Sequence, residues 1–407
     1  MTAISAPAMS PAGTRDVPRM DVRERWVPGP EAKYLVAMSA ILLVGGLAVL
    51  SSASAIVAVN EGRGSWYYLL RQLTGAAIGV VAFAVAAKMD AERWWQWAWP
   101  IMWFTLIALL LVLVMPNSIA PRINGSKRFL FASSFQPSEI GKFAVVVWSA
   151  MLVVKKGDQL RRFSRGLLPF LVVLGALAVL VAAEPDLSVA MLYALLMSVV
   201  LFAGGVRVAH FILVGFVAVP FLWTQIERVQ YALLRLTAFL DPGSTSSAVS
   251  YQLRQSLIAV GSGGLFGTGF GEGRQQYGFL PYPYSDFIGS NIGEEFGFLG
   301  IAVITLLFGA YGLLGFRIAR QARSPFLQLV AVGLTFTTVL TAYIHIGVVV
   351  GLLPTTGLTL PFVSYGRSNL VLTMFLTGVL VNIGSARERV VGTRATDPLA
   401  GASPGRR

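Results

Sequence analysis

Ten long apolar segments, separated by polar connections, constrain this sequence more than any other feature. They lie near residues 34–59, 66–87, 95–115, 138–154, 167–183, 187–202, 208–226, 287–316, 326–353 and 362–383. A helix needs roughly 20 apolar residues to cross the ~30 Å hydrocarbon layer of a membrane. Only 13% of the 407 residues are charged, about half the share found in soluble domains. The sequence therefore predicts an all-α polytopic membrane protein with about ten transmembrane helices and excludes an ordinary soluble enzyme.

The basic residues are distributed unevenly between the two sides of this predicted membrane domain, residues 34–386. The net charge is +13, and 21 of the 32 Lys and Arg residues fall on the side that holds both termini. Because basic residues concentrate in cytoplasmic loops, we expect both termini in the cytoplasm. Residues 1–33 have no apolar signal-peptide core and are expected to form a flexible cytoplasmic tail, and residues 387–407 a second one. Membrane orientation explains the basic excess, so no nucleic acid partner is expected.

Two predicted outer connections are unusual. The connection at 116–137 carries Lys127 and Arg128 beside aromatic residues. The connection at 227–285, between the seventh and eighth helices, is far longer than the 2–8 residues that usually join helices. Its aromatic, aliphatic and glycine content is typical of an ordered cap at the membrane surface rather than of a disordered segment.

Charged residues inside apolar segments are costly and are functional candidates by default. Glu139 and Lys142 stand three residues apart at the start of the fourth segment and share a helix face. They form either a mutually neutralising packing pair or the wall of a polar cavity. Arg71, in the second segment, either reaches out to the interface or pairs with a carboxylate.

Glu184 and Asp186 flank a proline between the fifth and sixth segments. The proline breaks the helix and frees backbone groups there. The two carboxylates either bind a cation or position a hydroxyl, or they belong to a solvated outer turn.

Asp286 lies where the long outer connection enters the eighth segment. A half-buried carboxylate at this place would be a stronger base and could act on a substrate hydroxyl. The alternative is an N-terminal helix cap formed by Ser285 or Asp286. The preceding glycines lack a nucleotide-binding pattern. The chain has no cysteine, and its two histidines lie far apart, so neither a thiolate nor a histidine metal site is expected. No organic cofactor is expected either.

Several separated motifs together resemble one family. They are SSASA at 51–55, RQL at 71–73, KRF at 127–129, FQPSEIGK at 135–142, EPDL at 184–187, RLTAFLDP at 235–242, YQLRQSLIAVGSGGLFGTGFG at 251–271, SDFIGSNIGEEFGFLG at 285–300 and GVVVGLLPTTGLTLPFVSYGRSN at 347–369. In this order they resemble the SEDS (shape, elongation, division and sporulation) peptidoglycan glycosyltransferases of bacteria over residues 34–386. The YQLRQSLIA segment and the basic N-terminal tail resemble the division type, FtsW, more than the elongation type, RodA.

The resemblance implies an inverting glycosyltransferase in the bacterial cytoplasmic (inner) membrane. It would polymerise lipid II, an undecaprenyl-pyrophosphate disaccharide-pentapeptide, into β-1,4 glycan strands on the outer face, with Asp286 as the catalytic base. The implied substrate-binding residues are Glu139, Lys142, Glu184, Asp186, Arg71, Lys127, Arg128 and Arg367. The implied partners are a class B penicillin-binding protein and other divisome proteins at the septum, with a divalent cation, Mg or Mn, as a candidate cofactor.

The sequence departs from the family pattern at three places. Tyr284 replaces a histidine two residues before Asp286, Arg367 and Asn369 stand where small residues are usual, and His345 replaces an asparagine. Two other functions remain open: a lipid II flippase or transporter, and a non-catalytic divisome scaffold. Most intramembrane carboxylates fall near the outer face, and this asymmetry favours the enzyme.

Overall fold

The computed structural model describes residues 21–123, 126–130, 135–212, 230–241 and 248–392. The chain divides into two compact units. The larger unit spans residues 28–385 and is described first; the smaller one combines residues 1–27 with residues 386–407.

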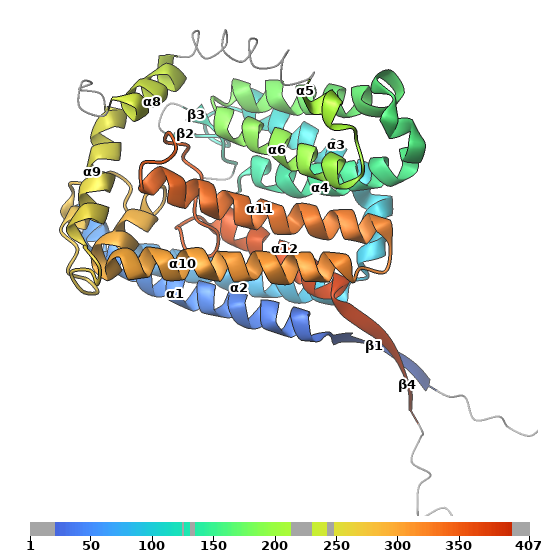
Figure 1. Ribbon diagram of the computed structural model, residues 1–407. Coiled ribbons are helices and arrows are strands. Elements are labelled where there is room, and N and C mark those ends of the chain that lie inside the picture. The colour runs from blue at the N-terminus through green and yellow to red at the C-terminus, as the bar shows by residue number, and fades with distance from the viewer. Residues whose placement is uncertain (1–20, 124–125, 131–134, 213–229, 242–247, 393–407) are drawn as a thin grey trace, which may run out of the picture. The chain divides into compact units, whose positions relative to one another are not determined.

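The larger unit is a bundle of helices (Figure 1). Among the described residues, seven helices are long and apolar enough to cross a membrane. They are α1 (Pro30–Asn60), α2 (Tyr67–Lys88), α3 (Trp94–Val114), α4 (Pro137–Lys156), α5 (Leu168–Ala183, which reaches this length together with the helical turn that precedes it), α10 (Ile288–Arg320) and α11 (Pro325–Val349). Two shorter apolar helices, α6 (Leu187–Ala203) and α12 (Arg367–Ile383), pack with them.

Local sequence signals explain where several of these helices begin. α1, α4 and α11 each start with a proline, whose missing N–H is not needed in the first helical turn. The side chain of Ser324 accepts a hydrogen bond from the Leu327 N–H at 3.3 Å and caps α11. Short helical turns precede α3 (η1, Ala91–Arg93) and α5 (η2, Gly157–Arg161, and η3, Phe163–Leu167).

Nine of the ten predicted segments coincide with described helices, and the boundaries differ by a few residues. α1 begins at Pro30, four residues before the expected start, and α12 begins at Arg367 rather than at residue 362. The seventh segment, 208–226, is helical at 208–212, and its remainder lies outside the described residues. The count of about ten therefore stays a prediction.

The long outer connection contains two helices, α8 (Gln230–Leu240) and α9 (Ala248–Ser262), and the short turn η4 (Gln275–Tyr277). The glycine-rich segment after α9 lies against α10. The N–H groups of Thr268 and Gly269 donate to the carbonyls of Glu294 and Glu295 at 2.9 and 3.1 Å. Gly267 has a φ of +83°, and a Cβ there would meet the Glu295 carbonyl oxygen at 2.1 Å, so only glycine fits this approach.

α4 lies in the interior of the bundle. In α4, 83% of the apolar membrane-spanning stretch is buried inside the protein, against about a third or less in α1, α2, α3, α5 and α10. It packs against α3, α6, α11 and α12. Polar residues on α4 are therefore enclosed by protein rather than by lipid, which places Glu139 and Lys142 inside the bundle.

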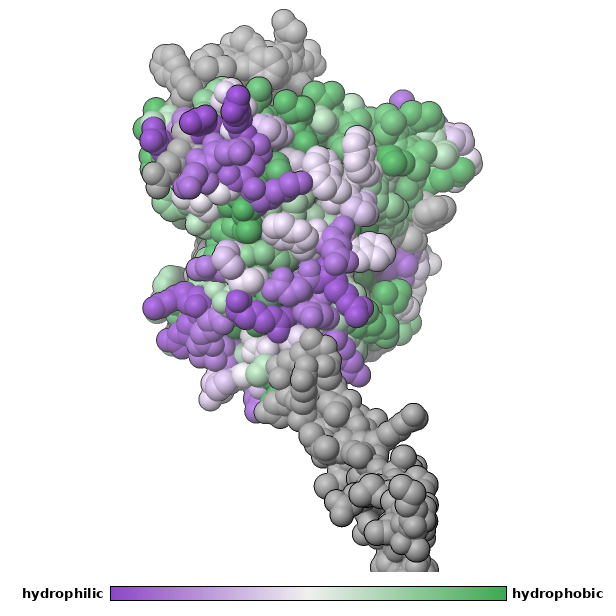
Figure 2. Space-filling model, turned by 90° about the vertical axis from the view of Figure 1, so that its right-hand side faces the viewer, coloured by the Kyte–Doolittle hydropathy of each residue, from purple (hydrophilic) through white to green (hydrophobic). Residues whose placement is uncertain are grey.

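A small antiparallel ribbon, β2 (Arg122–Ile123) and β3 (Ser126–Lys127), joins α3 to α4, with Arg122 opposite Lys127. At the other end of the bundle, Figure 2 shows hydrophilic side chains gathered on one face and hydrophobic side chains along its flanks. Basic residues lie in or next to the connections α2–α3, α4–α5 and α10–α11: Arg93 in η1, Lys155 in the last turn of α4 and Arg320 in the last turn of α10.

In the smaller unit, β1 (Asp21–Pro28) and β4 (Ser385–Gly392) pair in a two-stranded sheet. The sequence predicted flexible tails over 1–33 and 387–407 and did not predict this pairing. Residues 1–20 and 393–407 lie outside the described residues.

Candidate active site

Asp286 lies in the turn that precedes α10 and is partly exposed. The next two residues, Phe287 and Ile288, are buried, and Phe287 packs with Leu280 and Val348. The N-cap of α10 is Phe287, and no side chain caps the helix. The predicted alternative, a capping role for Ser285 or Asp286, is therefore wrong, and the Asp286 carboxylate is available for another role.

The charges around Asp286 come from three other parts of the chain. Surrounding protein raises the pKa of Asp286 to about 6, because burial penalises its charged form. The guanidinium groups of Arg235 and Arg128 act in the opposite direction and lower the pKa, and the Asp186 carboxylate raises it. We call Asp286, Asp186, Arg128 and Arg235 the charged cluster.

Arg128 lies between α3 and α4, and its side chain binds the break between α5 and α6. Its Nη1 forms an ion pair with Asp186 Oδ2 at 3.2 Å, while Nε and Nη2 donate to the carbonyls of Glu184 and Pro185 at 3.2 and 2.5 Å. Asp186 also caps α6 by accepting from the Val189 N–H at 3.3 Å. Burial raises the pKa of Asp186, and Arg128 opposes this shift.

Glu184 lies beside the cluster with its side chain turned inward. It is 1% exposed, and neither carboxyl oxygen has a hydrogen-bond partner among the described residues. Burial and then the nearby Asp186 raise the pKa of Glu184 to about 8. Glu184 is therefore largely protonated at neutral pH, although it lies only two residues from Asp186, which is paired with Arg128.

Glu139 and Lys142 form the expected pair on α4, with 2.7 Å between Oε2 and Nζ, and both are buried. The Tyr193 hydroxyl donates to the Ser138 carbonyl at 2.6 Å and fixes the start of α4 against α6. Glu139 also acts electrostatically on Asp186, which links the pair to the charged cluster. Packing and a polar wall are thus compatible roles for the pair.

Arg235, on α8, is the first residue of the RLTAFLDP motif but was not predicted as a site residue. Its Nη1 donates to the Thr356 carbonyl at 3.1 Å and to Ser188 Oγ at 3.5 Å. A Cβ on Gly357 would lie 3.7 Å from Arg235 Nη2 and 3.9 Å from Asp286 Oδ2, so both groups face the same small space. The signal was its place in the RLTAFLDP motif, a basic residue on the outer connection.

The other predicted residues lie elsewhere. Lys127 Nζ donates to the Met115 carbonyl at 2.9 Å, at the end of α3. Arg71 Nη1 donates to the Tyr67 hydroxyl at 2.6 Å, and no carboxylate among the described residues pairs with Arg71. Arg367 starts α12 and packs against Gly75 of α2. Both arginines act electrostatically on the Tyr365 hydroxyl, whose pKa they lower, and neither acts on Asp286 as a member of the charged cluster.

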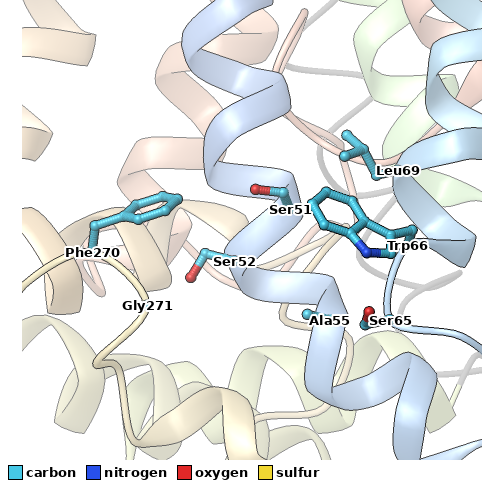
Figure 3. Close-up of a pocket in the computed structure, with 8 residues that line it drawn as sticks. All are labelled: Ser51, Ser52, Ala55, Ser65, Trp66, Leu69, Phe270 and Gly271. Carbon is cyan, nitrogen blue, oxygen red and sulfur yellow. The ribbon is translucent and has the colours of Figure 1, made fainter.

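A half-open cavity of about 180 Å³ lies at the junction of α1, α2 and the glycine-rich segment (Figure 3). It is lined by Ser51, Ser52, Ala55, Ser65, Trp66, Leu69, Phe270 and Gly271. None of the predicted site residues lines it. The cavity is therefore not the candidate active site.

A metal site can be tested on the arrangement of donors. Carboxylates suit Mg²⁺ or Mn²⁺. Within the described residues, however, no three Asp, Glu or His side chains converge as a metal-binding group. Asp186 is paired with Arg128, and Glu139 with Lys142. The described residues thus do not form a protein metal cage, and the positive charge in the site comes from side chains.

Comparison with known proteins identifies the family. Residues 33–389 match the FTSW_RODA_SPOVE family, described as cell cycle protein. A relative from Trichlorobacter lovleyi, named "Probable peptidoglycan glycosyltransferase FtsW", is 37% identical over 353 residues, covering 86% of this chain and 92% of the relative. "Stage V sporulation protein E" of Bacillus subtilis is 36% identical over 351 residues, covering 86% and 95%.

Solved structures share the fold. A chain from the structure titled "Structural coordination of polymerization and crosslinking by a peptidoglycan synthase complex" has a TM-score of 0.71 at 22% identity, covering 86% of this chain and 97% of its own. The crystal structure of Thermus thermophilus RodA has a TM-score of 0.63 at 24% identity, covering 86% and 95%. With the family match over almost the whole helical unit, these findings show that the chain is a multi-pass membrane protein of the FtsW/RodA/SpoVE family, the SEDS family.

Proposed function

We propose that this chain is a peptidoglycan glycosyltransferase that polymerises lipid II into β-1,4 glycan strands, with Asp286 as the general base. The observation that carries the proposal is the position of Asp286. Asp286 is a partly exposed residue, it does not cap α10, and the positive charges of Arg235 and Arg128 act on its carboxylate. The names of the relatives that match most of the chain support the same reaction class.

The chemistry requires one base and a binding site for negative charge. Asp286 removes the proton from the acceptor 4-hydroxyl while the oxygen of that hydroxyl bonds to the anomeric carbon of the donor sugar. The bond from that carbon to the pyrophosphate oxygen breaks, and undecaprenyl pyrophosphate leaves with the electron pair. A single displacement converts the α-linked donor into a β-linked product. The pKa of about 6 suits this role, because Asp286 is mostly deprotonated at pH 7 yet more basic than an exposed aspartate.

Basic side chains stabilise the departing pyrophosphate. Arg128 and Arg235 carry planar guanidinium groups that suit phosphate oxygens. Lys142 is already paired with Glu139, whose carboxylate acts on Asp186, so the pair shapes the charge beside these two arginines. A divalent cation remains part of the proposal only as an addition to these side chains, and no step depends on it.

The cellular setting follows from the same proposal. The enzyme acts on the outer face of the cytoplasmic membrane, with both termini in the cytoplasm, and works at the division septum. A class B penicillin-binding protein is the proposed transpeptidase partner, together with other divisome proteins. Relatives named FtsW support the division role.

The flippase and scaffold alternatives predict different behaviour. A flippase must present its charged groups to both sides, whereas the charged cluster belongs to connections at one end of the bundle: α3–α4, α5–α6, α8 and the turn before α10. A scaffold needs no ordered base beside two arginines. Both alternatives are less consistent with this arrangement.

The test is lipid II polymerisation by the purified full chain with its class B penicillin-binding protein. The parent protein should form glycan polymer, and Asp286→Asn should reduce the rate by about 100-fold or more, as loss of a general base does. Asp241→Asn, on the same long connection, is the control for loss of an outer carboxylate. If Asp286→Asn polymerises lipid II as fast as the parent, the catalytic assignment is wrong. Lipid II transfer across proteoliposomes without polymer would identify the flippase.

A further inference from the structure

One face of α2 carries two buried polar residues that the proposed chemistry does not use. Tyr68 and Gln72 lie one helical turn apart and are 6% and 0% exposed. Both contact segments far away in the sequence. Buried polar groups are costly unless they are bonded, so their partners indicate what these residues do.

Gln72 binds the backbone of the turn that precedes α12. Its Nε2 donates to the Ser364 carbonyl at 3.1 Å, and its Oε1 accepts from the Gly366 N–H at 3.1 Å. The two ends of one amide thus bracket Tyr365. This geometry fixes the place of the 364–366 turn relative to α2.

The 364–366 turn in turn holds the residues directly before Asp286. Ser364 Oγ donates to the Ser285 carbonyl at 2.7 Å, and the Tyr365 N–H donates to the Tyr284 carbonyl at 2.9 Å. Both carbonyls that precede Asp286 in the chain are therefore bonded to a turn that Gln72 holds.

Tyr68 adds a side-chain contact to the same place. Its ring stacks on the Tyr284 ring with 4.4 Å between centroids, and Tyr365 packs edge-on against both rings, at 5.1 and 5.7 Å. The Tyr284 hydroxyl donates to the Tyr68 hydroxyl at 3.4 Å, which itself donates to Glu61 at 2.7 Å. The tyrosine that departs from the family pattern is thus part of this stack.

The base of this arrangement is rigid, because α2 and α12 approach closely. A Cβ on Gly75 would lie 3.1 Å from Arg367 Cγ, and one on Gly79 would lie 2.5 Å from Met374 Sδ. A close-packed helix pair transmits displacement instead of absorbing it.

We propose that Tyr68 and Gln72 are positioning residues for the reaction, which hold the turn at 284–286 so that the Asp286 carboxylate faces the acceptor hydroxyl. The inference rests on the proposed function, in which Asp286 is the base. Neither residue touches substrate in this scheme; both act through the backbone of Tyr284 and Ser285. A displacement of about 1 Å at a catalytic group can lower a rate by about 100-fold.

The test compares Gln72→Leu with Thr74→Val, in the full chain with its partner. Gln72→Leu removes both bonds to the 364–366 turn. Thr74→Val also removes a side-chain hydrogen bond on α2, but that bond ends on the Arg71 carbonyl of the same helix. Two quantities are measured: kcat and KM for lipid II polymerisation, and hydrogen exchange of the peptides that cover 360–368 and 282–287.

Gln72→Leu should lower kcat by about 10- to 100-fold with KM within about twofold, because orientation and not binding is lost. Exchange of the Tyr365 and Gly366 amides should be faster. Thr74→Val should match the parent in both measurements. Faster exchange with unchanged kcat would overturn the inference, because the bonds from Gln72 to the 364–366 turn would then not matter for catalysis. Unchanged exchange would also overturn it, because Gln72 would then not hold the turn.

Ser364→Ala provides a milder variant should Gln72→Leu fold poorly. It removes the bond to the Ser285 carbonyl and the bond that Ser364 Oγ accepts from the Leu360 N–H at 2.8 Å, but it keeps both bonds of Gln72 to the turn, and kcat should fall with KM near that of the parent. The double variant Gln72→Leu/Ser364→Ala should keep at least about half the rate of the slower single variant, because both changes release the same turn. Multiplying losses would overturn the inference. An inactive parent protein would instead contradict the proposed function, while the exchange data would still show whether Gln72 holds the 364–366 turn.

Discussion

Arg128 Nη1 and Asp186 Oδ2 form an ion pair of 3.2 Å at the break between the end of α5 and the start of α6. The Arg128 guanidinium also binds the carbonyls of Glu184 and Pro185, which follow the end of α5, while Asp186 caps α6. Carbonyls at a helix end inside a membrane protein need partners from the protein, since lipid provides none. The pair therefore stabilises the break between α5 and α6 as well as placing charge in the candidate active site.

Arg128→Lys should weaken the site although it keeps the charge. A lysine ammonium is a point donor and cannot reproduce three contacts made by one planar fork. We expect a polymerisation rate about tenfold lower and a lower Tm in detergent. Arg122→Lys, an exposed Arg-to-Lys change in the same connection, is the control and should resemble the parent. Equal rates for Arg128→Lys and the parent would show that the fork geometry does not matter.

The pH dependence of polymerisation should report on Asp286. A general base works only when deprotonated, so kcat/KM should fall below about pH 6, by up to tenfold per pH unit. Arg235 holds the pKa of Asp286 down, so Arg235→Gln should move this acid limb to higher pH. Initial rates between pH 5 and 8 measure both effects. Arg254→Gln, on α9, is the control for loss of an outer basic residue.

An acid limb that stays in place in Arg235→Gln would contradict the electrostatic link between Arg235 and Asp286. A limb that is absent from the parent protein would contradict the assignment of Asp286 as a base with a raised pKa.

The helices were predictable from sequence because apolar length alone reports membrane spans. Asp286, Asp186 and Arg128 were predictable as separate charged residues near predicted helix ends. Their convergence was not, because it depends on how the α3–α4, α5–α6 and α8 segments fold back over the bundle. Arg235 was missed for this reason: its neighbours Thr356 and Asp286 are distant in sequence.

The role of Gln72 was hidden for a different reason. A glutamine in an apolar helix has no charge to draw attention, and its two partners are backbone groups of residues nearly 300 positions away. Backbone donors and acceptors leave no mark on the sequence of the segment that provides them. Side-chain pairs on one helix, such as Glu139 and Lys142, were readable because three-residue spacing fixes their proximity.

Glu184 should make folding stability depend on pH. Its pKa is about 8 in the folded protein and near 4.5 when exposed, so the folded state retains a proton that the unfolded state releases. Stability contributed by the neutral form is therefore lost progressively as pH rises from about 4.5 to 8. The Tm of the parent should fall over this range, and Glu184→Gln should fall less. Glu272→Gln, an exposed carboxylate on the glycine-rich segment, is the control. Parallel Tm curves for Glu184→Gln and the parent would show that Glu184 is ionised when folded.

A substitution at Gly141 tests how closely α4 must pack against its neighbours to hold Glu139 and Lys142 in place. A Cβ there would lie 2.0 Å from the Tyr193 hydroxyl oxygen and 2.6 Å from its ring, so Gly141→Ala must displace Tyr193 or α4. We expect a loss of about 1–3 kcal/mol in stability and slower polymerisation. Gly175→Ala, on α5, meets no atom within 4 Å and should keep or raise the Tm, because alanine favours helix.

A second-site change separates packing from other effects of Gly141→Ala. Tyr193→Leu removes the hydroxyl and the ring atoms that the new Cβ would meet, although it also removes the bond to the Ser138 carbonyl. The double variant should therefore recover part of the Tm lost by Gly141→Ala. Thermal unfolding in detergent measures all four proteins. A double variant less stable than either single variant would show that the Tyr193 bond, rather than the close approach at Gly141, holds the start of α4 in place.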